Sequence, residues 1–351
     1  MTKSVVLVVG TRPNFVKAAP VLKALHAHND FTPIFVHSGQ HYDNNLSANI
    51  FHDIGIDAPD VIFTTPWNAE EFESAFSIFL DKHSPSAVLV FGDVDTTRIA
   101  AEVTHSKDIP LVHIEAGLRS FDSRMPEEAN RIRTDELSDI LFATEQSAVA
   151  NIANEKLKGK VHFVGNTMID CLASLEHKIK PPTDAENEKP TLIVTIHRRE
   201  NIHNKETLTF LIEQLIECAA HYSMYWPLHP HTKKMIEEFN LSPMLSHFST
   251  TEPEGYLQFL SRINNAYAVI TDSGGIQEEA TYLGVPCFTL RESTERPVTT
   301  EVGTNTLLSI NNLKEKTLLK HMDIRKENTS IPDLWDGHAA ERIVEALLTQ
   351  L

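Results

Sequence analysis

Cysteine is scarce in this chain, and so are long apolar runs. Only three of the 351 residues are cysteine; they lie far apart and form no C-x-x-C pair. Each has apolar neighbours, which is typical of buried thiols. The first residues, Met1–Lys3, lead into an apolar run that is too short to span a bilayer, and no cleavage site follows it. We therefore expect a cytoplasmic protein with no membrane contact.

Surplus positive charge and the common phosphate-binding motifs are also absent. The formal net charge is -17, so no basic surplus is available to displace counterions from nucleic acid, and we expect no nucleic-acid partner. No G-x-G-x-x-G follows the first apolar run, and no G-x-x-x-x-G-K-[ST] occurs. These absences disfavour a dinucleotide-dependent hydride-transfer enzyme and a P-loop kinase. A phosphate ligand would have to be bound by local cations and free N–H groups.

What the sequence does contain is a regular alternation of short apolar runs with amphipathic stretches. This pattern is typical of buried parallel strands joined by helices, as in a doubly wound α/β sheet. The length suggests two such domains. The expected strands are Val5–Val9, Pro33–Val36, Ala87–Phe91, Leu111–Ile114, Ile140–Ala143, Val161–Val164, Leu192–Ile196, Tyr225–Leu228, Ala268–Ile270 and Val285–Leu290.

A polar, proline-containing stretch near residues 179–190 divides the alternation into two halves. We predict an interdomain linker there, between a first domain over residues 1–178 and a second over residues 187–336. The last segment, Ala339–Leu348, is amphipathic. Its apolar side either closes the second domain or crosses back to the first.

Polar residues collect directly after the expected strands of the first half, where ligands of open α/β sheets bind. Arg12 and Lys17 follow the first strand, at a turn into a helix whose free N–H groups favour anions. Asp93 and Glu115 follow two further strands. Each of these carboxylates alone is as consistent with a cap or an ion pair as with catalysis, but two at one sheet edge favour a functional site.

Further on, a proline precedes two carboxylates at an expected helix start. Glu127 and Glu128 after Pro126 serve either the chemistry or merely the helix dipole. In the second half, His197 follows a strand and is succeeded by two arginines. An imidazole beside guanidinium groups suits acid/base chemistry or phosphate contact.

The most specific segment runs from Asp272 to Glu279. Gly274 and Gly275 would let a diphosphate approach the backbone, and Ser273 with the N–H groups of a helix start could bind its oxygens. Glu279 falls in the first turns of that helix, where its carboxylate could accept both hydroxyls of a ribose. The alternative is that Ser273 only caps the helix.

The histidines of His229-Pro230-His231 have no partner cluster at zinc-like spacing. We therefore expect no metal site. His229 follows an expected strand, and a place on the wall of a ligand-binding cleft, beside the phosphates, is the better functional interpretation.

Taken together and in order, these segments resemble the non-hydrolysing UDP-N-acetylglucosamine 2-epimerase family. The resemblance extends over nearly the whole chain. The motifs that carry it are Gly10–Lys17, Gly39–His41, Gly92–Thr97, His113–Arg119, Pro126–Arg131, His197–Asn201, Asp272–Glu279 and Thr294–Pro297.

The resemblance implies two Rossmann-like domains in a glycosyltransferase-B-type arrangement with an interdomain cleft, and a homodimer. It places the last helix, residues 337–351, with the first domain. The implied reaction converts UDP-N-acetylglucosamine to UDP-N-acetylmannosamine, a precursor of cell-surface polysaccharide. UDP is eliminated to give 2-acetamidoglucal and is then added back, with no cofactor. The implied catalytic residues are Asp93, Glu115, Glu127 and His197; the implied substrate contacts are Arg12, Lys17, Ser273, Gly274, Gly275, Glu279 and Arg296.

The sequence departs from the family at a second, regulatory substrate site that many bacterial members carry. Gln40 is present, but Asp43 stands where a second glutamine is expected, and no arginine occurs in Thr64–Asn68. We therefore do not expect substrate activation of that type.

Other functions compete with this interpretation. The segment Ser120–Met125 also resembles epimerases of UDP-2,3-diacetamido-uronic acids, and hydrolysing 2-epimerases release N-acetylmannosamine and UDP from the same scaffold. A retaining glycosyltransferase would share the fold but would not need Asp93, Glu115 and Glu127 together. A catalytically silent nucleotide-sugar sensor would not retain all four candidate catalytic residues.

Overall fold

The computed structural model describes residues 2–40, 50–63, 66–181, 189–324 and 326–351. The chain forms two compact units. Unit 1 contains Met1–Glu176 together with Asp333–Leu351, and unit 2 contains His177–Pro332. None of the helices in the described ranges is both long and apolar enough to cross a bilayer.

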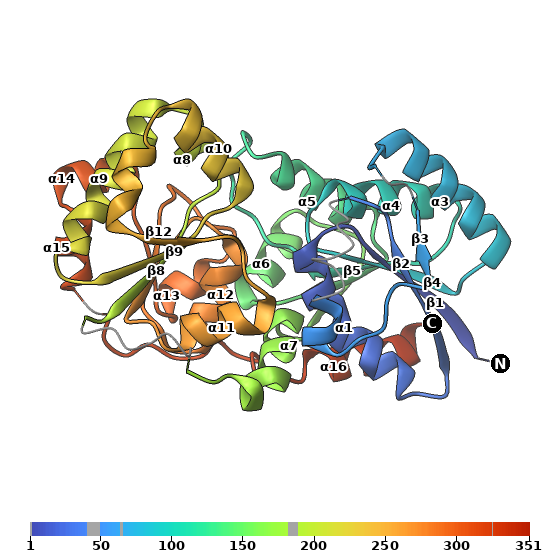
Figure 1. The fold of residues 1–351 in the computed structure, drawn as a ribbon. Coiled ribbons are helices and arrows are strands. Elements are labelled where there is room, and N and C mark those ends of the chain that lie inside the picture. Colours follow the sequence, from blue (N-terminus) through green and yellow to red (C-terminus); the bar gives the residue numbers. More distant parts are fainter. Residues whose placement is uncertain (1, 41–49, 64–65, 182–188, 325) are drawn as a thin grey trace. The chain divides into compact units, whose positions relative to one another are not determined.

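Unit 1 is built on a seven-stranded parallel sheet with the strand order β3-β2-β1-β4-β5-β6-β7 (Figure 1). The order reverses direction between β1 and β4, which creates the crevice where ligands of such sheets bind. The strands are β1 (Lys3–Val9), β2 (Phe31–His37), β3 (Val61–Ile62), β4 (Ala87–Phe91), β5 (Leu111–Ala116), β6 (Ile140–Ala143) and β7 (Lys160–Phe163). The helices are α1 (Arg12–His26), α3 (Ala69–His83), α4 (Asp95–Ser106), α5 (Pro126–Leu137), α6 (Gln146–Asn154), α7 (Thr167–Leu175) and α16 (Ala339–Gln350).

Unit 2 repeats this plan with a six-stranded parallel sheet of order β10-β9-β8-β11-β12-β13. Its strands are β8 (Thr191–Thr195), β9 (Ser223–Pro227), β10 (Ser249–Thr251), β11 (Ala268–Thr271), β12 (Cys287–Thr289) and β13 (Asn305–Leu307). Its helices are α8 (Arg199–Ile202), α9 (Lys205–Ala219), α10 (Pro230–Glu238), α11 (Tyr256–Asn264), α12 (Gly274–Tyr282), α13 (Pro297–Glu301), α14 (Ile310–Glu315) and α15 (Leu318–Met322). The predicted fold class, two Rossmann-like parallel sheets, is confirmed.

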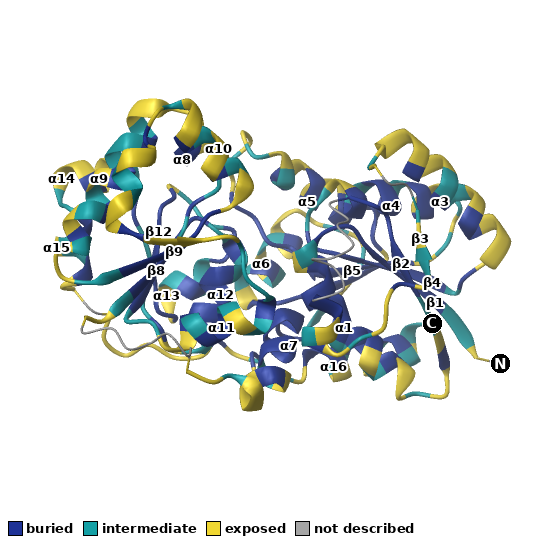
Figure 2. Cartoon of the chain, in the orientation of Figure 1, coloured by how far each residue is buried: buried dark blue, intermediate teal, exposed yellow. Residues whose placement is uncertain are grey.

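The central strands are buried on both faces, as their continuous apolar sequences require. Figure 2 shows dark strands beneath helices whose outer faces are exposed. In unit 1 the side chains of Val6, Val8 and Val88 pack with Phe72 and Phe76 of α3. Burying each such side chain contributes about 1.5–3 kcal/mol, which makes these cores the main source of stability.

Helix α16 belongs to unit 1 although unit 2 separates it in sequence from the rest of that unit. It packs against α1 and α7 (Figure 1). The buried carboxylate of Asp170 in α7 accepts the N–H groups of Ala339 and Ala340 at 3.1 and 2.7 Å, where α16 begins. Trp335 donates its indole N–H to the Thr144 carbonyl at 3.0 Å.

The attachment of α16 is expected to depend on pH. Burial raises the pKa of Asp170 from 3.8 to about 6, although the Ala340 and Ala339 N–H groups oppose the shift. A raised carboxyl pKa means that the folded state favours the protonated form. The contribution of protonated Asp170 to the free energy of unfolding is therefore fully present below about pH 4 and is lost as pH rises through about 6. The difference amounts to about 3 kcal/mol. Amide exchange of α16, corrected for intrinsic rates, should therefore show weaker protection at pH 8 than at pH 5.

Asp170→Asn keeps an oxygen acceptor without the charge, so its α16 protection should be equal at the two pH values. Asp170→Ala removes both and should weaken protection at either pH. Identical pH profiles for the original chain and Asp170→Asn would contradict this account.

Candidate active site

The turn after β1 is organised by Asn14 rather than by the cations that follow it. The Asn14 side-chain oxygen accepts the N–H groups of Gly10 and Thr11 at 3.3 and 3.2 Å. Its amide donates to the Phe91 carbonyl at 3.0 Å, which ties this turn to the end of β4. Arg12, a predicted substrate contact, is the first residue of α1 and is half-buried.

Lys17, predicted to contact phosphate, forms a buried ion pair with Glu115. Their side chains are only 5% and 4% exposed. Gly92 makes room for them, because a Cβ at that position would lie 3.1 Å from the Lys17 Nζ and 3.8 Å from a Glu115 oxygen. The structure therefore brings Lys17 and Glu115 together beside the turn that carries Asp93.

Glu115 has an unusual backbone conformation. Its φ is 76°, in the left-handed region that non-glycine residues seldom adopt. The register between β5 and β6 shifts at this point, between Ile114 and Ala116, so Glu115 occupies a bulge. Bulges redirect side chains next to active sites, and strain of this kind concentrates there. The buried ion pair with Lys17 opposes the conformational cost.

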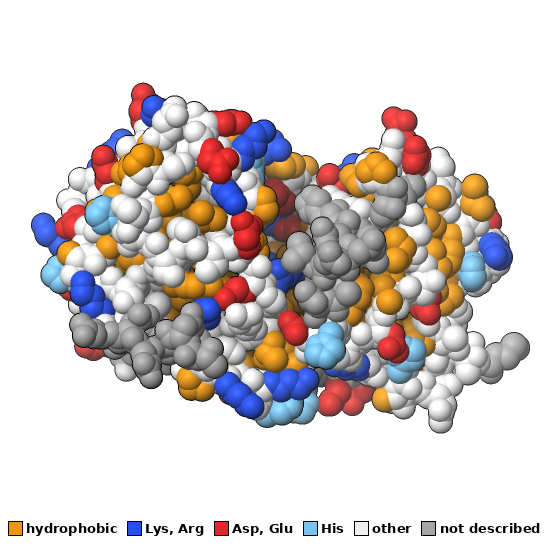
Figure 3. Space-filling model, viewed as in Figure 1, with side chains coloured by type: hydrophobic (Ala, Val, Ile, Leu, Met, Phe, Trp, Pro, Cys, Tyr) orange, Lys and Arg blue, Asp and Glu red, His pale blue; other side chains and the backbone are white. Residues whose placement is uncertain are grey.

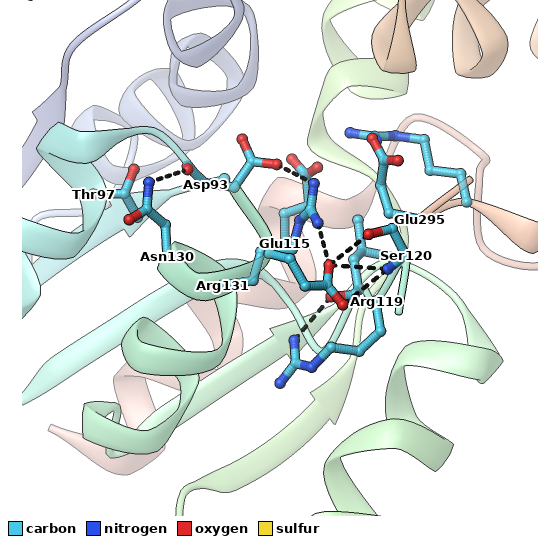
Figure 4. Close-up of polar contacts among 12 residues, drawn as sticks. Asp93, Thr97, Glu115, Arg119, Ser120, Asn130, Arg131 and Glu295 are labelled. Carbon is cyan, nitrogen blue, oxygen red and sulfur yellow. Dashed lines mark hydrogen bonds and ion pairs between the residues drawn. The ribbon is translucent and has the colours of Figure 1, made fainter. Parts of the chain in front are cut away.

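Asp93 is positioned by helix α5. Arg131 contacts its carboxylate at 2.6 Å, and Asn130 donates to its backbone carbonyl at 3.0 Å (Figure 4). The Asp93 side chain remains 21% exposed, so it is accessible to a ligand while its orientation is fixed. The predicted carboxylates Asp93 and Glu115 therefore share one edge of the sheet, at the ends of the neighbouring strands β4 and β5.

The two glutamates at the start of α5 differ sharply. Glu127 is half-buried near the helix N-terminus, whereas Glu128 is buried. Glu128 accepts the Ser120 and Phe121 N–H groups at 3.0 and 2.9 Å and pairs with Arg131 at 2.6 Å. In Figure 4, dashed lines mark the contacts that Ser120 and Arg131 make with the same carboxylate. Glu128 thus holds the loop before α5, a role that the sequence analysis missed although the Glu128–Arg131 spacing suits a helical ion pair.

A buried network lies beneath these carboxylates and was also missed. Asp135 in α5 contacts His113 Nδ1 at 2.6 Å and Arg119 at 2.7 Å, and accepts the Gly117 N–H at 3.0 Å. The other nitrogen of His113 lies 2.8 Å from the Gly92 carbonyl. Burial alone would raise the pKa of Asp135, but His113 and Arg119 outweigh it and hold the pKa below its usual range. Asp135 therefore stays ionised and connects the ends of β4 and β5.

In unit 2 a second buried carboxylate has the same function. Asp272, at the end of β11, accepts the N–H groups of His197 and Arg198, each at 2.9 Å, and the Asn201 amide at 3.0 Å. Its carboxylate also lies 3.1 Å from His197 Nδ1. Burial would raise the pKa of Asp272, but the hydrogen bond and charge of His197, together with hydrogen bonds from Asn201 and Arg198, hold the pKa below its usual range. His197 is thereby oriented with its side chain 37% exposed.

His229 lies near His197, as expected if both face one ligand. Their ring centroids are 5.4 Å apart. His229 is exposed at the N-cap of α10, where its Nδ1 accepts the His231 N–H at 3.2 Å. Among the described residues, no group of three or more histidine, cysteine or carboxylate side chains is arranged to hold a metal ion.

The start of α12 has the form of an anion site. Ser273 is at the N-cap, but its side chain does not cap the helix. Its backbone N–H is directed to Thr271 Oγ1 at 3.0 Å, and Gly274 and Gly275 follow in the first turn. The Ser273 side chain therefore makes no capping hydrogen bond, contrary to the alternative that it only caps the helix. The N–H groups of the first turn are suited to an anionic ligand.

Arg296 and Glu279 are both buried in unit 2. Arg296 contacts Glu278 at 2.7 Å and also pairs with Glu295, which in turn contacts Arg291 at 2.9 Å. Gly274 is closely packed here, since a Cβ would lie 2.7 Å from an Arg296 nitrogen. Arg296 therefore lies beside the start of α12 with two carboxylates of its own unit, and its contact with phosphate stays a prediction.

The motif Gly39–His41 is described only in part. Gln40 is buried, and its side-chain oxygen accepts the Thr96 N–H at 3.1 Å and the Thr96 hydroxyl at 2.8 Å. Gln40 therefore ties the segment after β2 to the start of α4. His41 and Asp43 lie outside the described residues.

Comparison with known proteins identifies the same family that the sequence motifs resemble. Residues 23–348 match the protein family described as UDP-N-acetylglucosamine 2-epimerase. A UDP-N-acetylglucosamine 2-epimerase of Methanocaldococcus jannaschii is 37% identical over 365 residues, covering 97% of this chain and 98% of that protein. The crystal structure of the Methanocaldococcus jannaschii UDP-GlcNAc 2-epimerase in complex with UDP-GlcNAc and UDP has a TM-score of 0.87 at 36% identity, with 99% of both chains covered.

A relative named for a different substrate is nearly as similar. The UDP-2,3-diacetamido-2,3-dideoxy-D-glucuronate 2-epimerase of Pseudomonas aeruginosa is 34% identical over 313 residues, covering 87% of this chain and 88% of that protein. Overall similarity therefore does not distinguish the two sugars, and the residues that contact the sugar must do so.

The buried network predicts a large stability cost when Asp135 loses its charge. Asp135→Asn would leave His113 without its anionic partner and Arg119 with Glu155 alone. Breaking a buried pair in this way costs about 3–5 kcal/mol. Urea unfolding at neutral pH measures this loss.

Glu102→Gln is the matched control for that experiment. Glu102 pairs with Arg98 at 2.7 Å, but both side chains are more than a third exposed. Removing this pair should change the free energy of unfolding by no more than about 1 kcal/mol. Comparable losses in the two variants would show that burial of Asp135 carries no special cost.

Proposed function

Because the chain belongs to the UDP-N-acetylglucosamine 2-epimerase family, we propose that it inverts carbon 2 of UDP-N-acetylglucosamine to give UDP-N-acetylmannosamine. The observation that carries the proposal is the pair of positioned carboxylates, Asp93 and Glu115, at the edge of the unit 1 sheet. Inversion requires a proton to leave one face of the carbon and return to the other. Two oriented acid/base groups meet that requirement.

We assign the chemistry at the sugar to unit 1. The reaction eliminates UDP to form 2-acetamidoglucal: the C2–H bond and the C1–O bond to the diphosphate break, and the proton passes to a carboxylate. Re-addition of UDP and protonation of carbon 2 on the opposite face complete the inversion. Asp93, Glu115 and Glu127 are the proposed acid/base groups, without a choice of which one takes the proton. The half-buried placement of Glu127 supports access to a ligand.

We assign most of the contacts that bind UDP to unit 2. The leaving diphosphate develops negative charge, which preorganised N–H groups and cations stabilise. The start of α12, with Ser273, Gly274 and Gly275, would bind its oxygens, while His197 and His229 offer imidazoles at a separation that suits one ligand. Arg12, Lys17 and Arg296 are further proposed contacts for phosphate, and Glu279 for the ribose.

The net charge of -17 does not oppose such binding, because the required cations are local. On the face shown in Figure 3, basic and acidic side chains are interspersed. A diphosphate would therefore be attracted at short range by specific groups, and its binding should be less sensitive to salt than that of a polyanion.

We further propose the non-hydrolysing outcome. The ordered loop held by Glu128 and the intact segment Pro126–Arg131 support a site that retains its intermediate instead of passing it to water. The domain limits at residues 1–178 with 337–351 and 187–336, the homodimer and the cytoplasmic location stay predictions. The absence of a cofactor likewise stays a prediction.

The second candidate substrate is a UDP-2,3-diacetamido-uronic acid. The relative from Pseudomonas aeruginosa and the segment Ser120–Met125 favour it. A carboxylate on the sugar would need a cation, and Arg124 in this segment is 75% exposed and pairs with Asp122 at 2.7 Å. The two substrates share the reaction, so a direct comparison separates them.

Proton NMR in deuterium oxide tests the reaction. UDP-N-acetylglucosamine should acquire deuterium at carbon 2 and yield the manno epimer, because the proton removed from carbon 2 exchanges with solvent. Free N-acetylmannosamine with UDP would instead identify a hydrolysing enzyme. If only the UDP-2,3-diacetamido-uronic acid is epimerised, the proposed substrate is wrong and the proposed mechanism stands.

Substitution of the proposed acid/base groups should separate chemistry from binding. Asp93→Asn and Glu115→Gln are expected to lower kcat by about 10²-fold or more, because a neutral amide cannot take a proton. The UDP dissociation constant, measured by calorimetry, should change far less than kcat, since most of the proposed UDP contacts lie in unit 2. Asp81→Asn, at an exposed carboxylate of α3, is the control. Parallel losses of kcat and UDP affinity would assign Asp93 and Glu115 to binding or folding.

A further inference from the structure

Phe121 is exposed in the loop between β5 and α5. Its side chain is 78% exposed, the highest value among the large hydrophobic side chains that the structure describes. It is also the only exposed aromatic residue within the described ranges. No ring contact is found for it among these residues, so folding does not account for this apolar surface in water.

The backbone of Phe121 is unfavourable as well. Its φ is 56°, in the left-handed region where a side chain is disfavoured and glycine is at ease. A residue that combines a strained backbone with an exposed ring carries two costs that glycine would avoid. Strain of this kind persists where the surroundings enforce it, and it concentrates at ligand-binding positions.

The loop is nonetheless rigidly held and is connected to the candidate active site. The Phe121 N–H donates to Glu128 at 2.9 Å, Glu128 contacts Arg131 at 2.6 Å, and Arg131 contacts Asp93 at 2.6 Å. Figure 4 shows Ser120, the preceding residue, on the same acceptor as Arg131. Three successive contacts therefore fix the Phe121 backbone relative to the carboxylate that is proposed to act at the sugar.

We propose that Phe121 is a specificity-determining residue whose ring packs against the methyl group of the substrate's acetamido substituent. This proposal rests on the proposed epimerase function. The hydroxyl and phosphate groups of a UDP-sugar gain little from an aromatic ring, whereas the acyl methyl is apolar and is attached through the amide to the reacting carbon 2. A ring on a backbone that Glu128 and Arg131 connect to Asp93 would bury this methyl and orient the carbon for proton transfer.

The test compares UDP-N-acetylglucosamine with UDP-N-formylglucosamine, which lacks only the methyl group. The original enzyme should prefer the N-acetyl substrate in kcat/KM by about tenfold, the lower end of what one methyl contact provides. Phe121→Ala should lose about tenfold on the N-acetyl substrate and little on the N-formyl substrate, so the preference disappears. The inhibition constant of UDP should stay unchanged, because UDP does not carry the acyl group.

Phe121→Gly separates this role from a structural one. Glycine suits the positive φ, so the denaturation midpoint should rise while kcat/KM for the N-acetyl substrate falls. A side chain that merely supports the fold would lower both. Ile78→Ala, at a side chain 69% exposed on α3, is the matched control and should change neither quantity.

Two outcomes overturn the proposal in distinguishable ways. If Phe121→Ala loses the same factor on both substrates, or none, the methyl contact is wrong and the epimerase function stands. If the unaltered enzyme epimerises neither substrate, the proposed function fails, and the role of Phe121 fails with it.

Discussion

The buried carboxylate of Asp135 is the interaction on which the rest of unit 1's candidate site depends. It reaches β4 through His113 and the Gly92 carbonyl, and it reaches β5 directly through the Gly117 N–H. A single buried charge thus links the two strand ends that carry Asp93 and Glu115. Asp272 does the same in unit 2 for the His197 loop. Each sheet therefore carries a buried carboxylate beside the groups proposed to meet substrate.

Much of this architecture could be predicted because it is encoded locally. Continuous apolar runs identified the central strands. Their carboxyl ends identified the sheet edge of Asp93 and Glu115 in unit 1 and that of His197 and Ser273 in unit 2. The strands that were missed, β3, β10 and β13, give no such pattern. The edge strand β10 consists of three exposed polar residues, and β3 has two residues. Their positions depend on the neighbouring strand and not on their own composition.

The parts of the site that escaped prediction are contacts between residues distant in the chain. Asp135 joins His113 across 22 positions, and Arg131 joins Asp93 across 38. Periodicity and propensity do not reveal such pairs. The choice between Glu127 and Glu128 illustrates the limit, since the helix dipole favours both alike and only the path of the loop before α5 buries one of them. Lys17 likewise could be predicted as a cation at the sheet edge, but not as the partner of Glu115.

Unit 1 is discontinuous in sequence, and this has a consequence for how the protein is made. Its sheet is complete by residue 163, yet α16 is translated only after the whole of unit 2. The apolar surface of α1 and α7 that α16 covers therefore stays exposed while the intervening residues are synthesised. Unit 2 is uninterrupted and can fold as it leaves the ribosome. Chaperones that shield nascent apolar surfaces are therefore expected to act on unit 1 for longer than on unit 2.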